Sequence, residues 1–216
     1  MVRWLDGLIV NITLTIKPSN NQTIIYMSNF KDRQGFEMGK WPELREAFNK
    51  TIQVVWAEKE LSEQFKQELF TMASIGSGCT HCQSHGAFHL NDMGVDKERI
   101  RDIWTYATSD AFTEGERAAF DLMIAASQIP NATTPENFEN LRKHYSDTEI
   151  IEILAISSAA AWLNRWNDTI ATVTDQESVD WATENLSDVG WKIGKHTGED
   201  KEQRKAHPLN MKWIKR

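Results

Sequence analysis

The segment from Ile150 to Ile170 constrains the fold more than any other part of this 216-residue chain. Apolar residues dominate it through Ala161 and occupy almost every side of a helix built from it. Such a helix is stable only when other elements bury most of its surface, which predicts a central helix. Ser146 and Glu149 form a capping box directly before it, so the start of this helix is specified locally.

Helical spacing of apolar residues continues along most of the chain from Trp41 onward. A first amphipathic run follows Pro42, a residue that suits the first turn of a helix. Further helix starts are indicated at Ser62, Asp96, Thr113 and Thr134. No alternating strand pattern appears in this region, so we predict an all-α fold built as one compact multi-helix domain.

The two ends of the chain differ from this helical body. We expect a poorly defined N-terminal arm over residues 1–40, a helical domain over residues 41–196 and a charged C-terminal tail over residues 197–216. Polar residues interrupt the apolar run near the N-terminus, which disfavours a secretory signal. No window reaches the ~18 consecutive apolar residues that a membrane helix needs, so we expect no membrane partner.

Composition excludes several classes of protein. The 31 acidic residues outnumber the 24 basic ones and give a net charge of −7, so we expect no nucleic-acid partner. Two cysteines are too few for a disulfide-rich secreted scaffold. These features together predict a cytoplasmic protein.

Both cysteines fall within four residues, Cys79 and Cys82, directly after the helix break Gly76-Ser77-Gly78. Nothing stops a new helix after Cys79, so the two thiols lie in its first turn. Residues three apart on a helix have Cβ atoms about 5–6 Å apart, close to what a disulfide tolerates. A helix N-terminus also lowers the pKa of a thiol, which predicts a reactive pair.

Three histidines and one acid accompany the thiols. His85 lies one turn beyond Cys82 and could accept its proton, and His81, four residues earlier, could orient His85. Glu68, on the preceding helix, could reach the imidazole of His85 if the two helices pack as a hairpin. An exposed surface acid is the other interpretation of Glu68. His89 is read as an ordinary histidine of a helix face.

A zinc site is the main alternative for this segment, because Cys79, Cys82, His85 and His89 are all zinc-ligand types. Four ligands from one continuous helix cannot easily surround a metal ion, and structural zinc sites usually draw ligand pairs from separate elements. Two inert buried cysteines are a further alternative. A thioredoxin-type site would need a βαβ unit, and the sequence indicates none.

Glu68 together with Gly78-Cys79-Thr80-His81-Cys82-Gln83-Ser84-His85 resembles the carboxymuconolactone decarboxylase-like superfamily, and within it the alkyl hydroperoxidase D-like members. Residues 112–120, 145–152 and 164–169 resemble a peroxidase-related branch of that family. The likeness runs from about Pro42 to about His196. Here the histidine follows the second cysteine by three residues, whereas in many relatives it follows by four.

The resemblance implies a thiol peroxidase or disulfide reductase with no metal or organic cofactor. By that likeness Cys82 is the thiolate that attacks the hydroperoxide, His85 and Glu68 relay its proton, Cys79 closes the disulfide and His81 assists. The helix terminus favours Cys79 as the more acidic thiol, but a neighbouring base gives Cys82 a proton route. The likeness also implies a dithiol reductant, either a lipoyl protein or a thioredoxin-like one, and a homo-oligomer.

Two other functions remain open: a dithiol/disulfide oxidoreductase that does not act on peroxide, and a zinc-binding structural module. Family members that lack the cysteine pair decarboxylate a muconolactone, and the intact pair argues against that activity. The stretch Asn164-Arg165-Trp166-Asn167-Asp168 is interpreted first as a polar helix end held by an Arg–Asp pair and a Trp anchor. Its other interpretation is a lining of the pocket, or of a subunit contact, beside the thiols.

Overall fold

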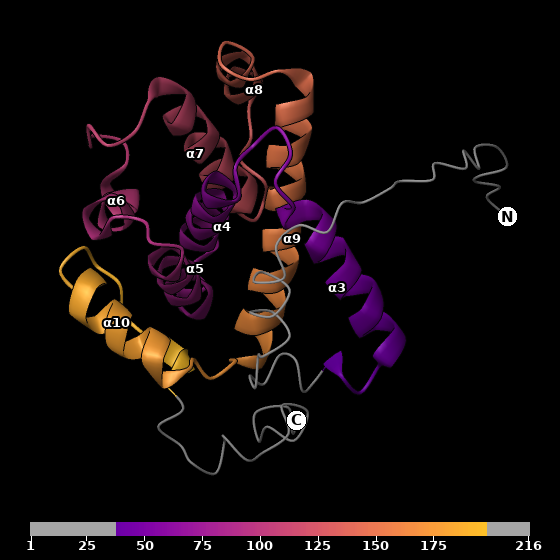
Figure 1. The fold of residues 1–216 in the computed structure, drawn as a ribbon, viewed down its shortest axis with the longest axis vertical. Helices are drawn as coiled ribbons and strands as arrows, with labels where there is room; N and C mark the ends of the chain where they lie inside the picture. The colour runs from indigo at the N-terminus through magenta and orange to yellow at the C-terminus, as the bar shows by residue number, and fades with distance from the viewer. Residues whose placement is uncertain (1–37, 198–216) are drawn as a thin grey trace, which may run out of the picture.

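The computed structural model describes residues 38–197, so the predicted N-terminal arm and C-terminal tail lie almost wholly outside the described residues. Within this range the fold is all-α and contains no strand, which confirms the predicted fold class (Figure 1). None of the helices between residues 38 and 197 is long and apolar enough to span a membrane.

Eight α-helices and two short 3-10 helices make up the described fold. In chain order they are α3 (Pro42–Trp56), α4 (Glu63–Ser77), α5 (Thr80–Asp92), α6 (Lys97–Asp102), η1 (Ile103–Thr105), α7 (Glu114–Ser127), α8 (Pro135–Leu141), α9 (Asp147–Ile170), α10 (Gln176–Leu186) and η2 (Gly194–His196).

Local capping chemistry sets the helix starts where the sequence predicts them. The Ser62 hydroxyl accepts a hydrogen bond from the Phe65 backbone N–H at the start of α4. Thr113 and Ser146 each form a full capping box, at the starts of α7 and α9. Gly78 ends α4 with φ 75°, in the left-handed region that glycine adopts without strain, so the chain turns directly into α5.

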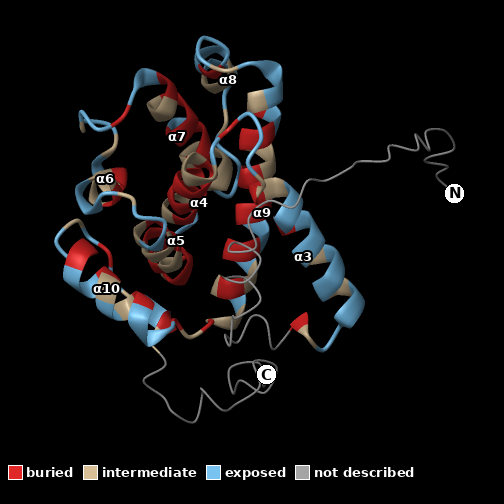
Figure 2. Ribbon diagram, in the orientation of Figure 1, coloured by how far each residue is buried: buried red, intermediate tan, exposed pale blue. Residues whose placement is uncertain are grey.

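The centre of the fold is α4 rather than α9, which corrects the expectation that the helix over Ile150–Ile170 is the central one. Every residue of α4 from Lys66 to Ser74 is buried, and α4 packs against α5, α7 and α9 (Figure 2). By contrast α9 leaves Ile151 and Trp162 exposed on one face. The buried stretch of α4 begins with polar residues, so the apolar content of the sequence does not indicate that this helix is central.

Each of those buried polar side chains has a partner on another element. The Lys66 ammonium lies 2.8 Å from Glu152 Oε2 on α9 and donates to the Ala57 carbonyl at 2.6 Å. The Trp56 indole N–H donates to Gln67 Oε1 at 3.0 Å. Buried polar groups cost free energy unless they are paired, so these bonds make a polar sequence compatible with a central helix.

Two features hold the start of α5 in position. Where α5 crosses α4, a Cβ atom on Gly86 would clash with the Thr71 hydroxyl, so glycine permits the close approach of the two helices. At the N-terminal end, the Thr80 hydroxyl donates to the Ile193 carbonyl at 2.8 Å, and the Trp191 indole donates to the Thr80 carbonyl at 3.1 Å. The chain after α10 is thereby fastened to the first turn of α5.

Candidate active site

The two cysteines lie together at the N-terminal end of α5. Cys79 is the N-cap residue and Cys82 lies in the first turn, as the sequence predicts. Both are free thiols, with exposed fractions of 0% and 2%. Their Sγ atoms are 2.8 Å apart, so a disulfide bond of about 2.0 Å would need only a small movement.

The surroundings of the two thiols separate their acidities. A hydrogen bond from Cys82 lowers the pKa of Cys79 to about 6 against the opposing effect of burial, and His196 lowers it further. Burial raises the pKa of Cys82 well above its ordinary value, and the neighbouring Cys79 raises it further, although Asn167 Nδ2 donates to Cys82 Sγ at 3.6 Å. The acidic thiol is therefore Cys79, whereas the resemblance implies a thiolate at Cys82.

His85 and His81 lie beside the cysteines but contact other partners. The Nε2 atom of His85 is 3.3 Å from Asp175 Oδ2, a carboxylate that the sequence does not indicate. The His81 ring lies 4.4 Å from the His85 ring, centroid to centroid, and its Nδ1 is 3.1 Å from the Thr174 hydroxyl. Burial lowers the pKa of His81 well below its ordinary value, and His85 adds to this effect. His81 is therefore neutral at neutral pH.

Glu68 is buried on α4, but its carboxylate binds an arginine rather than a histidine. Arg99 donates to both of its oxygens, from Nε at 2.8 Å and from Nη2 at 2.9 Å, and Gln64 donates to Oε1 at 2.9 Å. Arg99 also contacts Glu116, with 2.6 Å between Nη2 and Oε1. The expected contact between the Glu68 carboxylate and the His85 imidazole is thus corrected: the carboxylate that lies beside His85 is Asp175.

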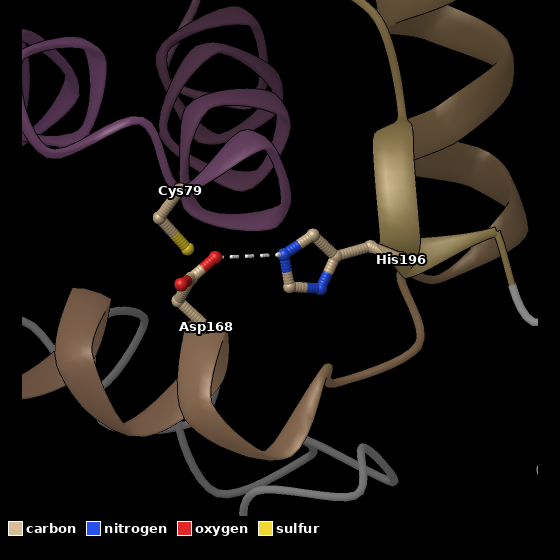
Figure 3. A group of neighbouring side chains, drawn as sticks. All are labelled: Cys79, Asp168 and His196. Atoms are coloured by element: carbon tan, nitrogen blue, oxygen red, sulfur yellow. Dashed lines mark ion pairs between the residues drawn. The ribbon is translucent and has the colours of Figure 1, made fainter. Parts of the chain in front are cut away.

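Two further residues reach the cysteines from distant parts of the chain, as Figure 3 shows. Asp168 comes from the last turn of α9 and His196 from η2, and their ligand-type atoms lie within 4.8 Å of one another and of Cys79 Sγ. The buried His196 ring has its Nε2 atom 3.7 Å from Asp168 Oδ1. The sequence offers no local signal for His196, because this residue lies far downstream of the cysteine segment.

The stretch at the end of α9 borders the thiols, which favours the pocket-lining interpretation of Asn164–Asp168. Asn167 is buried, donates to Cys82 Sγ, and accepts from the Thr172 hydroxyl at 2.8 Å. Asn164 Oδ1 accepts from the Ser74 hydroxyl on α4 at 3.0 Å. The polar end of α9 therefore links the central helix to the cysteine pair.

The alternative zinc set of Cys79, Cys82, His85 and His89 is not brought together. Among residues 38–197, the group of such side chains close enough to hold a metal ion is Cys79, Asp168 and His196. This group offers three donors, one short of the four of a structural zinc site, and its carboxylate already has a positive partner, because Lys195 Nζ lies 2.8 Å from Asp168 Oδ2.

Comparisons with known proteins place this site in context. Residues 42–125 match the model of the Carboxymuconolactone decarboxylase family. The uncharacterized protein YdfG of Bacillus subtilis (strain 168) is 24% identical over 92 residues, which cover 42% of this chain and 60% of that protein. The chain thus spans less than two thirds of the curated relative's length.

Solved structures give the wider likeness. The debrominase Bmp8 is 29% identical with a TM-score of 0.68, over 71% of this chain and 82% of that one. An uncharacterized peroxidase-related protein from Ralstonia eutropha JMP134, described as an alkylhydroperoxidase AhpD core, has a TM-score of 0.62 at 18% identity, over 73% of this chain and 84% of that one. Over residues 42–125 the chain is thus similar to the Carboxymuconolactone decarboxylase family, as its motifs predict, and its fold is similar to that of structures described as AhpD-like.

Proposed function

We propose that this protein reduces alkyl hydroperoxides with the thiols of Cys79 and Cys82. The overall reaction converts one hydroperoxide and two thiols to an alcohol, water and a disulfide, so atoms and electrons balance without a bound cofactor. The observation that carries the proposal is the pair of free Sγ atoms 2.8 Å apart, one of them acidic. A thiolate is the nucleophile in such chemistry, and a second thiol within reach completes the disulfide.

The acidities support an order of events in which Cys79 reacts first. Its thiolate would attack the peroxide oxygen, which breaks the O–O bond and leaves a sulfenic acid on Cys79. Cys82 would then displace water from that sulfur and close the disulfide. The adjacent rings of His81 and His85 lead toward Asp175, whose side chain is 52% exposed, and offer a proton route toward solvent.

Single-cysteine variants test this order. In Cys82→Ser, one equivalent of alkyl hydroperoxide should leave a sulfenic acid on Cys79, which dimedone traps and mass spectrometry detects. In Cys79→Ser, the same treatment should leave Cys82 unmodified, because its thiol lacks the lowered pKa. Trapping on Cys82 alone would instead favour the assignment that the family resemblance implies.

A donor must reduce the disulfide after each turnover. We expect a dithiol protein, lipoyl or thioredoxin-like, and a reducing compartment such as the cytoplasm. Thioredoxin and a lipoyl domain should each be assayed with oxidised protein, and failure of both would contradict the expected class of donor.

We also expect a homo-oligomer. Large apolar side chains are exposed on or directly before α3 and on α9, which pack against each other (Figure 1): Trp41, Val54, Ile151 and Trp162. Exposed apolar groups of this size mark interaction surfaces when they gather on one face. Light scattering should give a mass that is a multiple of 24.8 kDa, and a monomeric mass would contradict the expectation.

Reductive debromination is a second candidate, favoured by the 29% identity to the debrominase Bmp8. A further structure of that enzyme is a cysteine-to-alanine variant in complex with 2,3,4-tribromopyrrole. The same two thiols could convert an aryl bromide to the corresponding arene, bromide and a proton, with formation of the disulfide. The reduced protein should be mixed separately with an alkyl hydroperoxide and with 2,3,4-tribromopyrrole, while thiol loss and bromide release are followed. Faster thiol loss with the bromopyrrole would establish debromination over peroxide reduction.

A further inference from the structure

We propose that His196 is the base that accepts the proton of Cys79, with Asp168 and the Thr172 carbonyl as positioning groups. This assignment deepens the proposed function and rests on it for its biological purpose, although the proton transfer itself needs no peroxide. His196 lies in η2, outside the segment that matches the family model, and reaches the cysteines because the chain after α10 is fastened to α5.

Hydrogen bonding fixes the orientation of the His196 ring. Its Nδ1 lies 2.6 Å from the Thr172 carbonyl oxygen. A carbonyl oxygen only accepts hydrogen bonds, so Nδ1 must carry a proton and Nε2 is the atom left to exchange one. The Thr174 backbone N–H donates to the His196 carbonyl at 3.2 Å and holds the residue from its other side.

The exchangeable Nε2 atom faces the group formed by Cys79 and Asp168. All three ligand-type atoms lie within 4.8 Å of one another, and Nε2 is 3.7 Å from Asp168 Oδ1 (Figure 3). In the proposed step the S–H bond of Cys79 breaks, its electron pair stays on sulfur, and an N–H bond forms at Nε2. The Asp168 carboxylate then stabilises the imidazolium, the arrangement of a nucleophile, a base and an orienting acid.

Burial strengthens this interaction. Cys79 and His196 are both buried, so little water screens the thiolate from the imidazolium. The other titratable groups around them are Cys82 and His81 on α5, with the His81 ring 5.6 Å from the His196 ring, and Lys195, whose Nζ lies 2.8 Å from Asp168 Oδ2. His196 is the imidazole whose hydrogen bond lowers the pKa of Cys79.

A titration of thiolate absorbance in the ultraviolet tests the assignment, because it needs no access of reagent to the buried thiol. The reduced wild type should show a first thiolate midpoint near pH 6. His196→Gln keeps a polar side chain but removes the base, and should raise this midpoint by at least about one pH unit, roughly tenfold less thiolate at low pH. The matched control His144→Gln, at an exposed histidine in the turn after α8, should leave the midpoint unchanged. A midpoint in His196→Gln equal to that of the control would overturn the proposal.

A second measurement covers the case in which His196→Gln fails to fold. In wild-type protein labelled with ¹⁵N-histidine, the Nε2 resonance of His196 should shift at the Cys79 thiolate midpoint, and this inflection should vanish in Cys79→Ser. An inflection at the same pH in Cys79→Ser would refute a proton shared between the two residues. Neither measurement involves a substrate. A protein that does not react with hydroperoxide could therefore still show proton transfer from Cys79 to His196, so the proposed function and this proposal can be refuted separately.

Discussion

Replacement of Glu68 by glutamine separates a structural role of this acid from a catalytic one. Glu68 is fully buried, and Arg99 contacts both of its oxygens at 2.8 and 2.9 Å. Glutamine has the same shape, but it presents one amide NH₂ group to the donors of the guanidinium. The substitution therefore removes one of the two oxygens to which Arg99 donates, together with the negative charge. The contacts of Cys79 and Cys82 at the start of α5 are unchanged.

The expected loss of stability follows from the burial of this pair. Removal of one partner of a buried ion pair costs about 3–5 kcal/mol. Arg99 is 25% exposed and keeps both Glu116 at 2.6 Å and the Ala111 carbonyl at 2.7 Å, so the cost falls below that range. We expect Glu68→Gln to lower the free energy of unfolding by about 2–3 kcal/mol.

Urea unfolding and the single-turnover rate with hydroperoxide should be measured on the same preparations. The matched control Glu184→Gln, at an exposed position of α10, should change the free energy of unfolding by less than about 0.5 kcal/mol. Under native conditions the rate of Glu68→Gln should stay within a few-fold of wild type. A variant as stable as the control but slowed by about a hundredfold or more would refute this reasoning and restore Glu68 as a proton relay.

Three further predictions concern stability and metal content. Burial raises the pKa of Glu152, but the hydrogen bond and charge of Lys66 and the backbone N–H groups of Glu60 and Leu61 together outweigh it, so the net pKa lies below the ordinary 4.5. The stabilisation is therefore present above pH 4.5 and is lost as the pH falls through the folded-state value. In Glu152→Gln, Tm should decrease less than in wild type between roughly pH 5 and pH 3. An equal decrease in both proteins would contradict a stabilising ion pair between Lys66 and Glu152. Gly86→Ala should lower the free energy of unfolding by about 1–3 kcal/mol in urea titrations, since its methyl group meets the Thr71 hydroxyl, and a neutral effect would mean that α4 and α5 separate freely. Protein purified without chelator should contain far less than one zinc ion per chain by elemental analysis, whereas stoichiometric zinc that disappears in Cys79→Ser would favour a zinc-binding module.

The features that could be predicted from the sequence are those set by near neighbours in the chain. The capping residues Ser62 and Ser146 bond to backbone groups three residues away, so the starts of α4 and α9 follow from short motifs. The same holds for Cys79 and Cys82, which lie one helical turn apart at the start of α5. Local chemistry of this kind does not depend on how the helices pack.

The features that could not be predicted depend on contacts between distant segments. The sequence does not indicate that α4 is central, because Lys66, Gln67 and Glu68 are polar. Their burial is compatible with a stable fold only because partners on other elements pair with them. Spacing also could not reveal that Arg99 binds the Glu68 carboxylate, or that His196 and Asp168 lie beside Cys79. These outcomes are decided by tertiary packing around the cysteine pair.

The central claim is that Cys79 and Cys82 act together as the electron donor for a hydroperoxide. Free thiols should be titrated in fully reduced wild-type protein before and after addition of one equivalent of alkyl hydroperoxide. We expect a fall from two thiols per chain to none, and mass spectrometry should find Cys79 and Cys82 joined in one disulfide-linked peptide. Two thiols per chain that remain after the treatment, or thiol loss no faster than that of free cysteine, would contradict this role of the cysteine pair.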